Sequence, residues 1–145
     1  MTRDASIAGL LLEDAGRHLG TSATALSSGD LSGAYQLAYD ALRKSAASLM
    51  EVQGLRATSR GGHVAVQEAS QAQFGSTVRA FRSFGRIRRA RNSFEYPSTD
   101  EPGPSPDDVR DAITTATQAR EAAATILEQD LLTQWVPSPG ERPGN

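Results

Sequence analysis

Cysteine is absent from the 145 residues of this chain, so a disulfide framework and a zinc site built on cysteine thiolates are both excluded. Histidine is also scarce, with two residues, and the acidic side chains are scattered, so a metal site would need unusual ligands. We therefore expect no metal and no other cofactor. A chain without cysteine fits the cytoplasm, which is the location that we expect.

A long apolar run is absent too. The first residues hold a short apolar stretch, but Glu13 and Asp14 interrupt it, so we expect neither a signal peptide nor a membrane span there. Aromatic residues make up only 6% of the chain, whereas alanine and leucine are common. This composition favours helices that pack closely through small side chains. No strand-like alternation and no repeat is visible, and the length suits one domain.

The usual catalytic motifs are missing from the sequence. It has no Gly-x-Ser-x-Gly, no His-Glu-x-x-His and no pair of carboxylates on a core-facing side of a helix. Gly61 and Gly62 are adjacent, but no strand pattern precedes them and the lysine of a phosphate-binding loop is missing. The sequence therefore does not predict a serine hydrolase, a zinc protease of the His-Glu-x-x-His type or a P-loop enzyme.

Helical periodicity dominates what is present. Gly29 and Asp30 separate a first helix, which we expect to begin near Asp4 or Ser6, from a second one. A helical period predicts the inner side of the first helix, which would hold Ile7, Leu10, Leu11, Ala15 and Leu19. On the second helix Tyr35 and Tyr39 lie one turn apart, and we expect partly buried packing for them rather than a role in chemistry. Ser105 and the proline after it predict the start of the last helix. The first expected helix ends near residue 27, and the others cover residues 31–53, 63–74, 76–97 and 106–135. We expect an all-α, antiparallel bundle of four to five helices over residues 1–135, followed by a disordered tail over residues 136–145.

The segment 76–97 carries the strongest charge pattern. The net charge of −2 does not mark the whole chain as a nucleic-acid binder, but six of its fifteen basic residues lie between Arg79 and Arg91 without an acid among them. On one continuous helix, at about 100° per residue, four arginines share an outer stripe opposite Phe81 and Phe84. These four are Arg79, Arg82, Arg86 and Arg89. We expect them, together with Arg88, to attract nucleic acid without sequence preference.

The C-terminal end of this segment is more polar. Arg88, Arg91 and Glu95 continue the phenylalanine side, where charges are costly to bury unless they are paired. Arg91 and Glu95 are four residues apart and can form an ion pair, with Asn92 beside them and Tyr96 at the helix end. One interpretation is a structural ion pair at a helix end. The other is a polar site in a cleft or at a subunit interface, which we favour because charge, amide and phenol converge.

Three stretches in a fixed order resemble the HEPN domain family over residues 7–135. They are the helix AYQLAYDALRKSAASLMEVQGLR, then Gly-Gly-His, then RRARNSFEYP. The resemblance implies a helical bundle that dimerises, with the two Arg-Asn motifs facing each other across a cleft and RNA as the typical ligand. Many members are metal-independent ribonucleases of toxin–antitoxin and defence systems, often encoded beside a nucleotidyltransferase. In this chain Arg91 would be the catalytic arginine and Asn92 its polar neighbour.

The family's catalytic histidine, four to six residues after the arginine, has no counterpart, since Glu95, Tyr96 and a proline stand there. Metal-free RNA cleavage needs a general base and a general acid, and an arginine cannot be the base at neutral pH. The candidate catalytic residues are therefore Arg91, Asn92, Glu95 and Tyr96, with His63 as a further candidate. We expect at most a divergent, weak ribonuclease.

Two functions remain open. The first is a dimeric HEPN-like protein that binds RNA or a nucleotide, as a toxin–antitoxin or defence component with a degenerate ribonuclease motif. The alternative is a non-catalytic helical interaction module that pairs with a nucleotidyltransferase or another protein partner. Neither function involves a membrane.

Overall fold

The computed structural model describes residues 3–52, 79–96, 98–100 and 102–135, and these form five α-helices without a strand among them. The helices are α1 (Arg3–Ser28), α2 (Leu31–Val52), α4 (Arg79–Arg82), α5 (Phe84–Glu95) and α6 (Pro106–Trp135). The all-α class is thus confirmed, whereas the helix expected over residues 63–74 and the expected tail lie outside the described residues. None of the described helices combines the length and the apolar character that crossing a bilayer requires.

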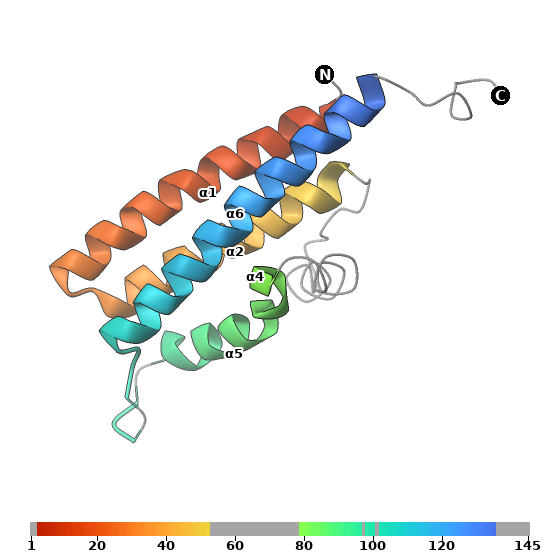
Figure 1. The fold of residues 1–145 in the computed structure, drawn as a ribbon. Helices are drawn as coiled ribbons and strands as arrows, with labels where there is room; N and C mark the ends of the chain where they lie inside the picture. The colour runs from red at the N-terminus through yellow and green to blue at the C-terminus, as the bar shows by residue number, and fades with distance from the viewer. Residues whose placement is uncertain (1–2, 53–78, 97, 101, 136–145) are drawn as a thin grey trace.

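The helix α2 lies at the centre of the bundle. It contacts α1, α5 and α6, and α6 also lies against α1. Figure 1 shows α1 and α2 running in opposite directions, and α5 lies along the lower side of the bundle. The helix α6 runs in the same direction as α2, so the expected antiparallel arrangement does not hold for this pair. The bundle is therefore a helical hairpin covered by α6 on one side and by α4 and α5 on another.

The turn between α1 and α2 is specified locally by its sequence. Gly29 has φ +88°, a conformation that glycine adopts without steric cost, and the amides of Gly29 and Asp30 donate to the carbonyls of Leu26 and Ala25. The Asp30 carboxylate then accepts a hydrogen bond of 3.0 Å from the amide of Gly33 and so caps α2. The predicted helix end and cap are both confirmed here.

The start of α6 is equally local. The Ser105 hydroxyl accepts a hydrogen bond from the amide of Asp108, whose carboxylate accepts one from the amide of Ser105. This reciprocal pair is a capping box, and Pro106 occupies the first helical position, where its missing amide proton costs nothing. The predicted start of the last helix is confirmed.

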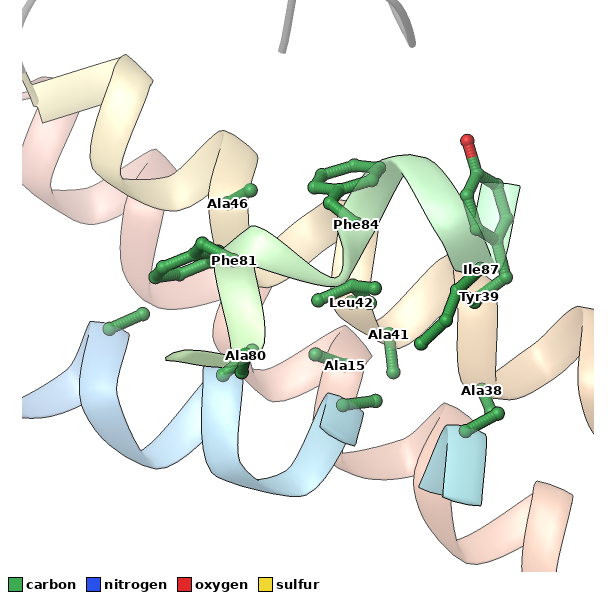
Figure 2. Packing of buried hydrophobic residues seen from close by; sticks show 14 of the residues in the cluster. Ala15, Ala38, Tyr39, Ala41, Leu42, Ala46, Ala80, Phe81, Phe84 and Ile87 are labelled. Atoms are coloured by element: carbon green, nitrogen blue, oxygen red, sulfur yellow. The ribbon is translucent and has the colours of Figure 1, made fainter. Parts of the chain in front are cut away.

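Small side chains let the helices approach closely. Eleven of the 21 buried hydrophobic residues of the described chain are alanines, and they lie on α1, α2, α4 and α6. Where α1 faces α2, the buried Ser22 hydroxyl donates a hydrogen bond of 2.7 Å to the carbonyl of Ala34. Figure 2 shows Ala15 of α1, Ala41 of α2 and Ala80 of α4 in the same part of the core, below Leu42 in that view. The close packing inferred from composition is thus present in the described core.

Leu10, which helical spacing suggested as part of the inner side of the first helix, is 60% exposed. That expectation was wrong. The buried positions of α1 are Ala8, Ala15 and Ser22, seven residues apart, and Leu10 lies about 200° around the helix from Ala8. Leucine spacing alone did not show that the buried side of α1 consists of smaller residues.

The segment 76–97 is not one helix, contrary to the sequence prediction. The described part divides at Ser83 into α4 and α5, with the Ser83 amide bonded to the Ala80 carbonyl at 3.2 Å. Phe81 and Phe84, on either side of it, are both fully buried. Figure 2 shows both rings among the buried residues of the core, which include Ala46 and Leu42 of α2. Burial of both rings therefore accompanies the break in helical geometry.

Candidate functional site

Arg91 is the best-anchored residue of the predicted site. Its Nη1 donates hydrogen bonds of 2.7 Å to Asn92 Oδ1 and 3.4 Å to Glu95 Oε2, and its Cζ lies 4.7 Å from the centre of the Tyr39 ring. Only 17% of the Arg91 side chain is exposed, against 48% for Glu95. The predicted pairing of Arg91 with Glu95, with Asn92 beside them, is confirmed. The guanidinium is thus held between α5 and α2.

Two tyrosines of α2 pack against aromatic rings of α5 beside Arg91. Tyr39 packs edge-on against Phe84 at a centroid distance of 6.1 Å, and Tyr35 packs edge-on against Phe94 at 5.0 Å. Burial raises the pKa of Tyr39 above its ordinary value and that of Tyr35 to about 12, although nearby arginines oppose the rise. Both phenols therefore stay neutral near pH 7. Packing, the interpretation that the sequence favoured for these tyrosines, is confirmed.

A groove adjoins the arginine. A pocket of about 280 Å³ lies between the first turns of α2 and the last turns of α5, and its lining includes Arg91, Phe94, Glu95 and Tyr35. A second pocket, of about 380 Å³, lies between the α1–α2 turn, the end of α5 and the loop before α6. Both pockets include Ser32 and Phe94 in their linings, so Phe94 stands where they meet.

The structure thus brings together some of the predicted site residues and separates others. Arg91, Asn92 and Glu95 form one cluster, whereas Tyr96 lines the second pocket and is 76% exposed. His63 lies outside the described residues. Tyr39 and Phe94 complete the site, and sequence reasoning did not assign them to it. The signal for Tyr39 was its place on the buried side of α2, which indicated packing but not which residue it would meet.

The arginine stripe is altered by the break at Ser83. Arg79 and Arg82 lie on α4, and Arg86 and Arg89 lie on α5, so they do not share one continuous helix as predicted. All four side chains are exposed, which agrees with an outer position, and Arg88 is partly buried. Arg86 pairs with Asp111 of α6 at 3.1 Å, so part of its charge is neutralised within the fold.

A second polar cluster joins α1 to α2. The Lys44 ammonium lies 2.8 Å from His18 Nε2 and 3.5 Å from Asp14 Oδ2. Desolvation, together with the charge of Lys44, holds the pKa of His18 below its ordinary value of 6.5, although Asp40 acts in the opposite direction. His18 therefore accepts a hydrogen bond from Lys44 as a neutral imidazole near pH 7. It is absent from the lining of both pockets beside Arg91.

The cluster at Arg91 is suited to binding an anion and poorly suited to proton transfer. A guanidinium can donate to phosphate oxygens but cannot accept a proton at neutral pH. In the described part of the chain, Glu95 is the one carboxylate bonded to it, and it already accepts a hydrogen bond from Arg91. Within the described residues, no group of three or more metal-ligating side chains comes together. The arrangement can position a phosphate, and Glu95, which Arg91 holds, is the one carboxylate in the described lining of its pocket.

Comparison of the chain with protein-family models, with curated proteins and with solved structures finds no match.

Proposed function

We propose that the protein is a dimeric HEPN-like protein that binds RNA at the Arg91–Asn92–Glu95 cluster without cleaving it efficiently. The observation that carries this proposal is the anchoring of the Arg91 guanidinium beside a groove. An arginine whose side chain is held by two polar neighbours and an aromatic ring loses little freedom when it binds a phosphate.

The surrounding charge supports RNA as the ligand. Four exposed arginines of α4 and α5 lie on the two short helices that lead to Arg91, and they can attract the phosphate backbone without reading sequence. In the described part of the chain Arg79 and Arg89 form no ion pair with an acid, which leaves their charge available. The all-helical bundle fits the expected family architecture.

Weak cleavage follows from the chemistry of the cluster. The 2′-hydroxyl of RNA needs a base before it can attack the neighbouring phosphate. Arg91 cannot provide that base, and Glu95 is bonded to Arg91. The role assigned to the cluster is therefore binding, with the two copies of a dimer placing their Arg91 residues near the two-fold axis.

The proposal is tested by fluorescence anisotropy with a labelled single-stranded RNA at salt concentrations from about 50 to 200 mM. The logarithm of affinity should fall linearly with the logarithm of salt concentration, with a slope of about −0.7 for each phosphate contacted. Replacing both Arg79 and Arg89 by Glu should weaken binding and flatten the slope, and gel analysis should show that the RNA stays intact.

A matched control keeps the overall charge change the same. Replacing Arg17 and Arg110 by Glu alters net charge equally, and both side chains are exposed on α1 and α6, outside the arginine-rich segment. This control should retain most of the wild-type affinity. Absence of RNA binding at low salt would overturn the proposal, and so would equal losses in the two double variants. Rapid metal-free cleavage that Arg91→Ala abolishes would show that the cluster is catalytic.

A further inference from the structure

The two pockets that meet at Phe94 differ in charge. The smaller one is lined by Arg91 and Glu95. In the larger one Asp30 is the single charged residue of the described lining, and its carboxylate already accepts a hydrogen bond from the Gly33 amide. A phosphate would meet no cation in the larger pocket, so that pocket suits an uncharged group, while the smaller pocket suits an anion.

An exposed aromatic ring stands at the larger pocket. Tyr96 is 76% exposed, and Leu10 is the other large hydrophobic residue that the described chain exposes. Tyr96 follows α5 directly, with extended backbone dihedrals of φ −112° and ψ 105°, and it is not part of the buried core. Single exposed hydrophobic residues are ordinary on protein surfaces. Tyr96 differs from Leu10 because it lines a pocket, and exposed aromatic rings are where proteins stack unpaired bases.

The size of the larger pocket suits one base. Its volume of about 380 Å³ is near the lower end of the range of roughly 300–1,000 Å³ found for ligand pockets. Ser32 and Ser98 belong to its lining, and their hydroxyls can donate to the ring nitrogens and carbonyls of a base edge. A paired base in a duplex cannot enter such a pocket, because its edge is already bonded and its faces are already stacked.

We propose that this larger pocket takes one unstacked base of single-stranded RNA, stacked on Tyr96, while the phosphate attached to that nucleotide binds Arg91 in the adjoining pocket. The inference rests on the proposed function and names its ligand as single-stranded rather than double-stranded RNA. Phe94, held edge-on against Tyr35, forms the wall over which the strand passes from one pocket to the other.

The experiment uses the full chain and a single-stranded oligoribonucleotide that carries 2-aminopurine, whose fluorescence is quenched when it stacks on an aromatic ring. Addition of wild-type protein should quench the probe. Tyr96→Ala should weaken binding by about 5- to 150-fold and abolish the quenching, whereas Tyr96→Phe should retain both. A duplex of the same sequence should bind more weakly than the single strand. Leu10→Ala, which removes the other exposed hydrophobic side chain, is the matched control and should bind like the wild type.

A second variant fills the pocket without touching the ring. Gly103 lines it, and an added Cβ there meets no atom within 4 Å, so Gly103→Leu should fold normally and exclude the base. The base pocket would be overturned if both Tyr96→Ala and Gly103→Leu kept the wild-type affinity and quenching. If Arg91→Ala lost RNA binding in the same experiment, the proposed function would still stand. A protein that binds no RNA at low salt would overturn both.

Discussion

Replacing Arg91 by Ala removes several contacts of one side chain at once. The guanidinium bonds to Asn92 and Glu95 and lies over the Tyr39 ring, while the methylene stem is largely covered, with 17% of the side chain exposed. The sequence alone, with Glu95 placed on a buried side, implied a loss of about 3–5 kcal/mol for an orphaned charge. The structure lowers that figure, because the Glu95 side chain is 48% exposed and water replaces its lost partner.

The magnitude follows from the separate contacts. A half-exposed pair four residues apart on a helix contributes about 0.3–0.5 kcal/mol. The cation over the Tyr39 ring is mostly desolvated and contributes about 1 kcal/mol, and burial of the stem contributes roughly another 1 kcal/mol. Arg91→Ala should therefore cost about 2–3 kcal/mol of unfolding free energy. For a domain of this size that corresponds to a Tm lower by about 5–10 °C.

Thermal unfolding followed by circular dichroism at 222 nm measures this change. Arg91→Met, which keeps the stem over Tyr39, should recover roughly half of the lost stability. Glu95→Gln removes only the exposed pair and should lower the Tm by no more than about 2 °C. The double variant Arg91→Ala with Glu95→Gln should melt close to Arg91→Ala. An Arg91→Ala protein that melts within about 1 °C of the wild type would refute the reasoning, as would equal losses in Arg91→Ala and Glu95→Gln.

Two further predictions concern pH and assembly. Because the pKa of His18 is lowered in the folded protein, the unfolded chain binds the proton more readily, so the stability that His18 contributes is complete above pH 6.5 and declines as the pH falls below it. Urea unfolding between pH 8 and pH 5 should show this decline in the wild type and a smaller one in His18→Gln; identical slopes would contradict it. Sedimentation at micromolar concentration should show a dimer, and Asn92→Arg, which adds charge beside Arg91, should shift it toward monomer. A wild-type monomer would contradict the proposed dimer.

The local features of this fold were predictable from the sequence because they depend on residues close together in the chain. Asp30 caps α2 through an amide three residues away, and the reciprocal bonds between Ser105 and Asp108 span the same distance. The ion pair of Arg91 and Glu95 joins adjacent turns of one helix. Such contacts follow from helical geometry alone, so the all-α class and most helix boundaries could be read from spacing and cap residues.

Features that depend on packing between helices were not predictable in this way. The helix break at Ser83 occurs between two phenylalanines that are buried in the core, and Leu10 is exposed because smaller residues of α1 face the neighbouring helices. Periodicity identifies a side of a helix but not how wide its contact will be or which helix will cover it.

The candidate site shows the same division. The sequence by itself determined that Arg91, Asn92 and Glu95 lie together, because they occupy one or two turns of a single helix. Only the tertiary structure decided that Arg91 lies over Tyr39 of α2 and that Tyr96 stands at the neighbouring pocket, lined by the α1–α2 turn and the loop before α6. Arg91 and Tyr39 are far apart in the chain, and so are Tyr96 and the α1–α2 turn. Their meeting depends on how the burial of alanines and aromatic rings brings the helices together, which no local spacing records.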